Sequence, residues 1–353
     1  MTGSEWFGSA PGGLNRYFTD LFGALSARPE IRVSAAAFGT APVGGQSWGP
    51  TGGSTWRRAR TAFRDEAAAA PGGAAVLDRH FALYGPPARP SRRRRLVVHF
   101  HGPWAAESRL AGSGALAAGA KYALERLRCW PADRFVVLSE HFRDLLVHDY
   151  GVRAEAVTVI APGVDTARFR PTPRPEHDAP VVLCVRRLEH RMGIDVLLRA
   201  WPAVRAAHPE ARLVLVGTGT AETALREQAG KLGASVTFAG RTTDTELTGW
   251  YARAAVTVVP SVALEGFGLI ALESLSAGRA PVVTDCGGLP DSVRGLDSSL
   301  IVAAGDADAL AARIAAALDG TVPDPDRCRA HAGTFSWSAA ADRHIALYRE
   351  LTG

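Results

Sequence analysis

The sequence predicts an α/β fold with parallel sheets, arranged in two domains. The chain has 353 residues, which is long for one compact core and sufficient for two. In its C-terminal half, short apolar runs alternate with segments of helical period. Continuously apolar strands alternating with helices indicate a parallel sheet covered on both faces. Ligands of such sheets bind at the carboxyl ends of the strands, so we expect functional residues there.

The C-terminal half gives the clearest elements. The expected strands are short apolar runs that contain β-branched residues. They lie at 181–185, 212–216, 236–238, 255–259 and 281–284. The expected helices follow them at 194–207, 222–231, 245–253 and 269–277.

The N-terminal half is less regular. Its expected strands are 96–100, 135–139 and 157–160, and its expected helices are 14–27 and 140–150. Residues 39–54 have loop composition, and the proline-rich, charged segment 171–180 reads as an interdomain linker. We therefore expect an N-terminal domain over 1–172 and a C-terminal domain over 173–335. The helical tail, 336–353, is expected to pack back on the N-terminal domain.

Composition and charge narrow the functional classes. Hydrophobic residues make up 47% of the chain and charged residues 21%, values that argue against wholesale disorder. The formal net charge of +5 fits an anionic substrate, or weak attraction to an anionic membrane surface. It is too small to indicate nucleic acid, and the arginines are not interleaved with aromatic residues.

Targeting and redox signals are sparse. The four cysteines are scattered without a CxxC pair, which argues against a zinc site or a disulfide framework. No signal peptide is visible, and no apolar run reaches the roughly 18 residues of a membrane span. We expect a reduced, cytoplasmic setting.

The strongest motif is a pair of glutamates around a glycine-rich turn. Seven residues separate Glu265 from Glu273, and an apolar run leads into the segment. Backbone N–H groups at the start of the following helix favour an anion, and Gly266 and Gly268 let the backbone approach it closely. Carboxylates accept hydrogen bonds from sugar hydroxyls. Each glutamate alone is equally well explained as a solvated or capping residue, but their pairing with the turn favours a phosphate cradle flanked by acids.

The segment Pro260–Glu273 resembles the E-x7-E motif of glycosyltransferase family 4, a retaining group with the GT-B fold. Further segments resemble the family pattern in the expected order, at 161–171, 185–188, 215–219, 238–241 and 278–290. The resemblance implies two Rossmann-like domains whose parallel sheets face each other across a central cleft. It covers residues 95–320 well, but residues 1–95 only through Gly12-Gly13 and the helix after them.

The resemblance also implies roles for individual residues. Glu265 would contact the transferred sugar and support charge at the reacting centre, and Glu273 would hold the ribose hydroxyls. Arg187 and Arg191 would bind the diphosphate, although surface salt bridges are the simpler explanation for single arginines. The remaining donor-binding residues implied by the motifs are Gly266, Phe267, Gly268, Leu269, Gly12, Gly13, Gly217 and Arg241.

Two positions and one segment depart from the family pattern. The family commonly has glycine where this chain has Arg186, and lysine where it has Met192, so that Arg191 is the nearest cation in the sequence. A guanidinium suits phosphate, which makes that change chemically tolerable. The family also begins with a strand that feeds the Gly12-Gly13 loop. Residues 1–11 contain Gly, Ser and Pro rather than an apolar run, so we expect this strand to be missing or reduced.

His99 and His101 follow each other at the end of an apolar run, and alternation puts them on one face. His101 matches the histidine that the family places near the transferred sugar. A structural role is the simpler explanation for a single histidine, and we retain it for His99.

Two arginine groups could contact anionic lipid. One is Arg92–Arg95 with Arg89 nearby, and the other lies on an expected helix that also carries Trp56 and Phe63 and comprises Arg57, Arg58, Arg60 and Arg64. Solvated surface is the simpler interpretation. Peripheral contact with the inner face of a membrane, which some family members use, is the alternative.

The resemblance implies transfer of a sugar from a nucleotide diphosphate sugar to a hydroxyl acceptor, with retained configuration and without metal or cofactor. The acceptor could be a glycan, a lipid-linked sugar or a natural product. A sugar-nucleotide epimerase or a phosphorylase on the same fold is an alternative, against which the E-x7-E segment argues. A non-catalytic binding partner is another, favoured by the doubtful first strand and opposed by Glu265, Glu273 and Arg187.

Overall fold

The chain divides into two compact units. The computed structural model describes residues 1–64, 75–86, 94–103, 109, 114–129, 131–172 and 179–353. One unit comprises Met1–Gly163 together with Trp337–Gly353, and the other Val164–Ser336. The first boundary between the units, after Gly163, lies before the expected boundary at residue 172. The reason is that the connecting segment packs on the second unit, where Ser276 Oγ donates to the carbonyl of Phe169 at 2.8 Å. Most of the expected linker lies outside the described residues.

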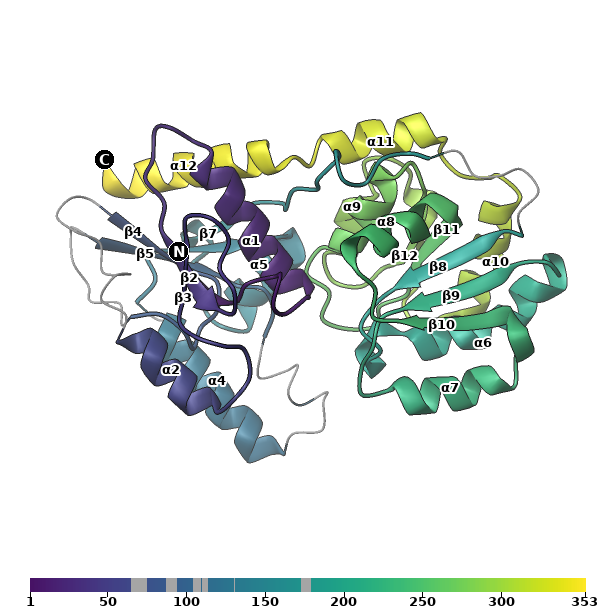
Figure 1. Ribbon diagram of the computed structural model, residues 1–353, viewed down its shortest axis with the longest axis horizontal. Coiled ribbons are helices and arrows are strands. Elements are labelled where there is room, and N and C mark those ends of the chain that lie inside the picture. Colours follow the sequence, from purple (N-terminus) through teal and green to yellow (C-terminus); the bar gives the residue numbers. More distant parts are fainter. Residues whose placement is uncertain (65–74, 87–93, 104–108, 110–113, 130, 173–178) are drawn as a thin grey trace. The chain divides into compact units, whose positions relative to one another are not determined.

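The second unit contains a parallel sheet, with strand order β10-β9-β8-β11-β12-β13 in the described residues (Figure 1). The strands are β8 (Val181–Val185), β9 (Arg212–Val216), β10 (Val236–Gly240), β11 (Ala254–Val259), β12 (Pro281–Thr284) and β13 (Ile301–Val302). The helices are α6 (Ile194–Ala207), α7 (Glu222–Gly230), α8 (Asp244–Arg253), α9 (Leu269–Ser276), α10 (Ala307–Leu318) and α11 (Pro325–Gly333). All the strands expected here are confirmed to within about two residues at their ends, the usual uncertainty of such assignments.

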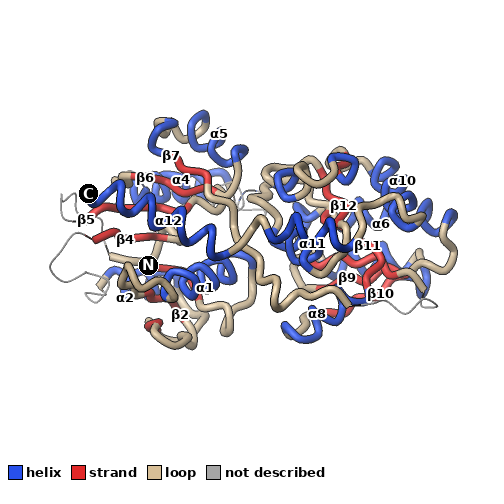
Figure 2. The backbone as a smooth tube through the Cα atoms, turned by 90° about the horizontal axis from the view of Figure 1, so that it is seen from above, coloured by secondary structure: helices blue, strands red, loops and turns tan. Residues whose placement is uncertain are grey.

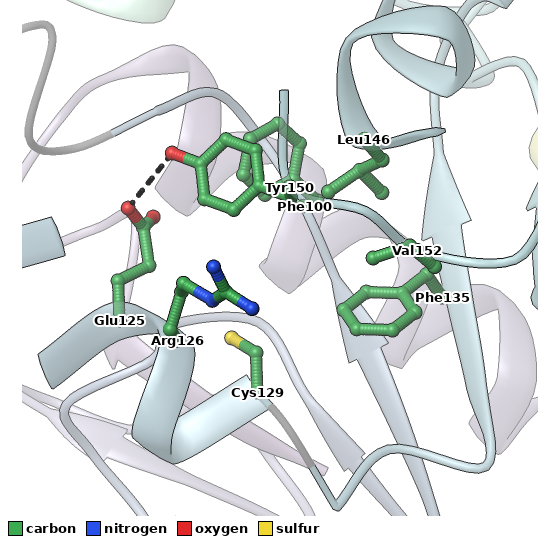
Figure 3. Close-up of a pocket in the computed structure, with 8 residues that line it drawn as sticks. All are labelled: Phe100, Glu125, Arg126, Cys129, Phe135, Leu146, Tyr150 and Val152. Atoms are coloured by element: carbon green, nitrogen blue, oxygen red, sulfur yellow. Dashed lines mark hydrogen bonds between the residues drawn. The ribbon is translucent and has the colours of Figure 1, made fainter. Parts of the chain in front are cut away.

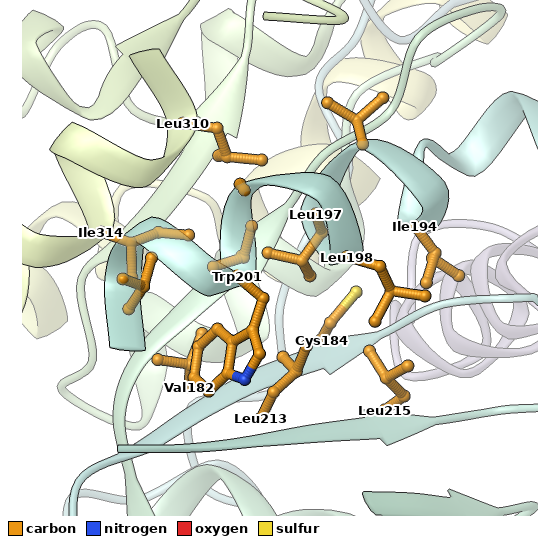
Figure 4. Close-up of a cluster of buried hydrophobic side chains, with 14 of the residues drawn as sticks. Val182, Cys184, Ile194, Leu197, Leu198, Trp201, Leu213, Leu215, Leu310 and Ile314 are labelled. Atoms are coloured by element: carbon orange, nitrogen blue, oxygen red, sulfur yellow. The ribbon is translucent and has the colours of Figure 1, made fainter. Parts of the chain in front are cut away.

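A buried tryptophan lies at the centre of the second unit's core. Trp201 on α6 is fully buried between the sheet and α10, and its indole N–H donates to Ser235 Oγ at 3.0 Å (Figure 4). Ile194, Leu197 and Leu198 recur at helical spacing on the same side of α6 and pack with it. This face fixes α6 against the sheet and so fixes the loop between β8 and α6.

The first unit also has a parallel sheet, with strand order β3-β2-β1-β4-β5-β6-β7 in the described residues. The strands are β1 (Thr2–Glu5), β2 (Ala35–Phe38), β3 (Gly45–Ser47), β4 (Ala75–Arg79), β5 (Arg94–His99), β6 (Arg134–Val137) and β7 (Val157–Val159). The helices are α1 (Gly13–Ser26), α2 (Thr55–Phe63), α4 (Ala115–Cys129) and α5 (Glu140–His148).

The first strand is present, so the expectation that it is missing is wrong, whereas the alternative of a reduced strand agrees with its four residues. β1 is short, but it lies between β2 and β4 and pairs with both. β1 lacks an apolar run because α1 packs close to it: a Cβ on Gly3 would lie 2.6 Å from the ring of Phe18. Glycine is thus required at a position where an ordinary strand would carry an apolar side chain.

The last helix, α12 (Trp337–Thr352), packs on the first unit (Figure 2). Ala340 and Leu347 join a core cluster with residues of β5 and β6. Arg343 Nη2 donates to the carbonyl of Val159 at 2.8 Å, and Arg28 Nη2 lies 2.8 Å from Asp342 Oδ1. Among the described residues, none of the helices combines the length and the apolar character needed to cross a bilayer.

Candidate functional site

The glycine-rich turn joins β11 to α9 as the sequence predicts. Gly268 caps α9 with a left-handed backbone (φ 88°), and a Cβ there would lie 2.3 Å from Leu289 Cδ1. Only glycine satisfies both conditions. The first N–H groups of α9 have no partners within the helix and form its positive end, which suits an anion.

Glu265 is held by two side chains and by the backbone. Its Oε2 accepts hydrogen bonds from Arg186 Nη2 and, at 3.0 Å, from Ser261 Oγ. Its carbonyl accepts from Gly288 N at 2.9 Å. Burial alone would raise the pKa of Glu265, but the charge and hydrogen bond of Arg186 together with Ser261 bring the pKa below its ordinary value. The carboxylate is therefore ionised at neutral pH.

Arg191 supports the backbone beside Glu265. Its Nη1 donates to the carbonyl of Leu264 at 3.1 Å, and its own carbonyl accepts from Val262 N at 3.0 Å. Leu264 has φ 53°, the one non-glycine residue with positive φ in the described chain, a conformation that persists only where its surroundings enforce it. Arg191 also contributes to the lowered pKa of Glu265. Arg191 therefore contacts the backbone of the turn, and its role in binding the diphosphate remains a prediction.

The structure distinguishes the two arginines that follow β8. Arg187, the predicted diphosphate clamp, is exposed, whereas Arg186 is only 8% exposed and contacts Glu265. Neighbouring residues of an extended segment point to opposite sides, so only one of the pair can turn inward. Arg186 is a departure from the family pattern, and its contact with the acid was not predicted from the sequence. The doubled arginine at a strand end was the available signal.

Glu273 lies on the second turn of α9 and is buried. The hydroxyl of Tyr251, on α8, donates to Glu273 Oε2 at 2.9 Å. Phe267, within the turn, is 3% exposed and its ring packs against that of Phe335 at 5.5 Å. The aromatic side chain of Phe267 thus anchors the turn, while Gly266 and Leu269 on either side of it are half-buried.

Gly217 and Arg241 lie at the ends of β9 and β10. Gly217 has φ 134°, and a Cβ there would lie 1.9 Å from the carbonyl oxygen of Arg186, so packing alone requires glycine. Gly217 N donates to the carbonyl of Gly240 at 2.8 Å, which places the exposed Arg241 next to this contact in the chain. Arg241 remains a predicted donor-binding residue.

In the first unit, His101 belongs to a group of stacked histidines. The rings of His99 and His101 lie 5.7 Å apart at 22°, so the prediction that they share a face is confirmed. His80, just beyond β4, stacks on His99 at 3.8 Å. Burial lowers the pKa of all three rings, to about 4 for His99, so they are neutral at pH 7.

The ring nitrogens of His80, His99 and His101 lie within 4.8 Å of one another, a spacing at which a shared metal ion is worth considering. Metal ligation requires each nitrogen lone pair, which lies in its ring plane, to point at one ion. The rings are stacked at 20° to 24°, so their planes do not converge on a nearby point. We therefore interpret the cluster as a packed polar group that positions His101.

Asp78 and His344 complete this group. Asp78 Oδ1 lies 2.9 Å from His99 Nε2, and the ring of His344 on α12 stacks on His99 at 5.2 Å. Tyr348, also on α12, donates to Asp78 Oδ2. Asp78 and His80 were not predicted because the hydrophobic pattern did not indicate β4, although the run from 75 to 80 carries both an acid and a histidine.

The Gly12-Gly13 pair lies at the start of α1. A Cβ on either glycine would meet nothing within 4 Å. The described part of the fold therefore does not require glycine at these two positions, and their predicted approach to the donor remains a prediction.

A separate small pocket lies in the first unit, lined mainly by apolar side chains of α4, β6, α5 and the segments that follow β5 and α5 (Figure 3). Two of its lining residues are joined by a hydrogen bond that Tyr150 donates to Glu125 Oε2 at 3.2 Å, and burial raises the pKa of Cys129 to about 12. None of the predicted site residues lines it.

Comparisons with known proteins place the chain in a family. Residues 11–168 match the model described as Glycosyltransferase Family 4, and residues 179–320 match that described as Glycosyl transferases group 1. D-inositol 3-phosphate glycosyltransferase 1 of Catenulispora acidiphila is 35% identical over 246 residues, 62% of this chain and 57% of that protein. The chain thus spans a little more than half the length of this relative.

A second relative is covered more fully. The GDP-mannose-dependent alpha-(1-6)-phosphatidylinositol monomannoside mannosyltransferase of Mycolicibacterium smegmatis is 32% identical over 283 residues, 75% of this chain and 69% of that protein. The crystal structure of HepE from Anabaena in complex with UDP-glucose has a TM-score of 0.74 at 18% identity, covering 99% of this chain and 98% of HepE, and so shows the same fold. The chain belongs to glycosyltransferase family 4.

Proposed function

We propose that the chain transfers a sugar from a nucleotide diphosphate sugar to a hydroxyl acceptor with retained configuration. The observation that carries this proposal is the ionised Glu265, held by Arg186 and Ser261 at the turn that opens α9. Relatives that name their donors use GDP-mannose or bind UDP-glucose. A UDP- or GDP-linked sugar is therefore the proposed donor, and a glycan, lipid-linked sugar or natural product the proposed acceptor.

The proposed mechanism uses electrostatics at both ends of the breaking bond. The anomeric carbon becomes cation-like, and the Glu265 carboxylate stabilises that charge. The diphosphate leaves with negative charge, which the positive end of α9 and the nearby arginines stabilise. The acceptor hydroxyl attacks from the leaving-group side, and the departing phosphate takes its proton. The reaction in this form requires no metal ion, so chelation by EDTA should leave the rate unchanged.

His101 is the proposed contact from the first unit to the transferred sugar. Its neutral ring can donate one hydrogen bond and accept one, as sugar hydroxyls require. The stacked His80 and His99 restrict the orientation of that ring. His101→Ala should therefore lower kcat more than it weakens binding of the free nucleotide.

A thermal-shift screen against UDP, GDP and their sugars tests donor binding. A ligand that binds only the native state raises the melting temperature with its concentration. We expect one nucleotide series to stabilise the chain and Arg187→Ala to remove most of the effect. No shift with any diphosphate would contradict the proposal.

Product analysis distinguishes the alternatives. Transfer that requires an acceptor supports a glycosyltransferase, whereas a changed sugar without acceptor would indicate an epimerase and use of free phosphate a phosphorylase. Slow donor hydrolysis by wild type but not by Glu265→Ala would show that the site is catalytic. If neither protein hydrolyses or transfers while both bind nucleotide, the chain is a binding partner.

We also propose peripheral contact of α2 with an anionic membrane. Trp56 and Phe63 are 79% and 50% exposed, which is unusual for aromatic side chains. Arg57, Arg60 and Arg64 lie exposed beside them, while Arg58 turns inward to Glu5 at 2.9 Å. In the other arginine group, Arg95 contacts Asp133, and Arg89, Arg92 and Arg93 lie outside the described residues.

Sedimentation with vesicles tests this contact. Aromatic side chains that enter the interface and cations that meet anionic headgroups predict binding to phosphatidylserine-containing vesicles and much weaker binding to neutral ones. Trp56→Ser with Phe63→Ser should abolish it, whereas Leu116→Ser, an exposed apolar position on α4, should not. Equal binding to neutral vesicles would contradict the electrostatic part.

A further inference from the structure

Two departures from the family pattern meet in the second unit. Arg186 replaces the usual glycine and Met192 the usual lysine, six positions apart in the sequence. In the structure the two side chains touch, with Arg186 Nη2 2.8 Å from Met192 Sδ. Both residues are buried, at 8% and 5% exposure. The guanidinium of Arg186 therefore contacts the side chain at position 192, where the family has the ammonium group of a lysine.

The placement of this guanidinium is built into the fold. Arg186 follows β8, and its backbone N–H donates to the carbonyl of Val216 at 2.9 Å. Gly217 lets the neighbouring chain pass directly over the carbonyl of Arg186. Ser261 Oγ and Glu265 Oε2 both accept from Nη2. The cation thus has a fixed position beside the acid at the turn.

The same guanidinium retains unused hydrogen-bonding capacity. Its Nε is buried and has no hydrogen-bond partner in the protein. A guanidinium offers five N–H donors, and all the side-chain contacts described for Arg186 use Nη2. A buried charged donor left without an acceptor is costly, so a ligand with anionic oxygens suits it. Phosphate accepts paired N–H groups from a guanidinium particularly well.

We infer that Arg186 binds the diphosphate of the nucleotide donor and takes over the role of the lysine that the family has at position 192. The inference rests on the proposed function and adds a binding residue to it. The two substitutions are coupled, because a lysine at 192 would place a second cation in contact with Arg186. Methionine instead gives the guanidinium a polarisable, uncharged neighbour.

Calorimetric titration of UDP, GDP, UMP and GMP into four variants tests the inference. Arg186→Gly should weaken binding of the diphosphate by about tenfold or more, the effect of losing a charge-assisted hydrogen bond. Monophosphate binding should change much less. Arg186→Gly with Met192→Lys should restore diphosphate binding, whereas Met192→Lys alone should not improve on wild type. Arg199→Ala, which removes an exposed arginine paired with Asp195 on α6, is the matched control and should leave binding unchanged.

The outcomes separate this inference from the proposed function. If wild type binds no diphosphate, the proposed function fails. If wild type binds the diphosphate and Arg186→Gly binds it equally well, the inference fails and the function stands. The same holds if Arg186→Gly loses affinity for monophosphate and diphosphate alike. Should the single variant not fold because Glu265 loses its partner, the double variant gives the answer. A crystal structure of wild type with the diphosphate decides independently: a guanidinium on phosphate supports the inference, and one remote from it overturns it.

Discussion

The hydroxyl of Tyr348, near the C-terminus, donates a hydrogen bond to the carboxylate of Asp78 on β4. Asp78 is buried and Tyr348 half-buried, and burial together with the charge of Asp78 raises the pKa of Tyr348 far above its ordinary value. Burial would raise the pKa of Asp78 too, but the neighbouring histidines and their hydrogen bonds lower it. The pair therefore joins a neutral donor to a charged acceptor and ties α12 to the strand beside the histidine cluster.

Tyr348→Phe should destabilise the protein by about 1–3 kcal/mol, because it removes a donor from a buried carboxylate without removing the carboxylate. Urea denaturation gives the free energy of unfolding. Tyr122→Phe is the matched control, since Tyr122 makes an exposed hydrogen bond to the carbonyl of Asp149 at 3.3 Å. Equal losses for the two variants would contradict the importance assigned to the Asp78 contact.

The stability of the protein should fall as the pH drops from about 6.5 to about 4. Burial lowers the pKa of His99 and of His344 from 6.5 to about 4. Between those values the unfolded chain binds protons that the folded chain does not, so each histidine destabilises the fold by about 1.4 kcal/mol per pH unit at most. Above pH 6.5 neither residue contributes a pH dependence.

His344→Gln should reduce this slope, measured as the free energy of unfolding at successive pH values. His148→Gln, which changes an exposed histidine on α5, should leave the slope as in wild type. The Asp78 carboxylate acts in a different pH range. Its pKa is lowered on folding, so its contribution to stability is present above pH 4 and is lost only at more acidic pH. Loss of stability confined to pH below 4 would therefore point to Asp78 rather than to the histidines.

The fold was predictable where hydrophobic pattern decides it. The run Val181–Val185 is a buried central strand, and every residue of such a strand can be apolar. β1 and β4 were missed because Gly3 must be small beneath Phe18, and because Asp78 and Arg79 are buried polar residues with tertiary partners. Local pattern contains no information about such partners.

The segment that forms the site around Glu265 was predictable from the sequence, but the side-chain contacts within it were less so. The position of Glu265 and of the turn after it followed from the motif. Which of Arg186 and Arg187 faces Glu265 depends on how the chain leaves β8, whose position is set by its pairing with β9 and β11. The resemblance assigns Arg187 to the diphosphate and makes no prediction for Arg186, which the structure brings to the acid.

Gly287→Ala should reduce both stability and transfer. Gly287 has φ 57°, and a Cβ there would lie 2.2 Å from the carbonyl oxygen of Glu265. The substitution adds a backbone clash to the cost of a left-handed alanine, which is about 1–2 kcal/mol. Gly305→Ala is the control for the cost of the left-handed alanine alone, since Gly305 has φ 82° and open space around it. We expect a larger loss of melting temperature for Gly287→Ala and a lower kcat for it alone; equal behaviour of the two would mean that the Glu265 backbone tolerates displacement.

The predicted ribose contact of Glu273 can be tested by changing both partners. If the carboxylate accepts hydrogen bonds from the ribose hydroxyls, Glu273→Gln should weaken UDP or GDP binding by about tenfold, a loss typical of a charge-assisted hydrogen bond. The same substitution should matter much less for the 2′,3′-dideoxy nucleotide, which lacks those hydroxyls. Tyr251→Phe leaves the carboxylate in place but removes its donor at 2.9 Å, so it should produce a smaller loss with the same dependence on ribose. If Glu273→Gln weakens both nucleotides equally, Glu273 serves the packing of α8 against α9 through Tyr251 and does not bind ribose.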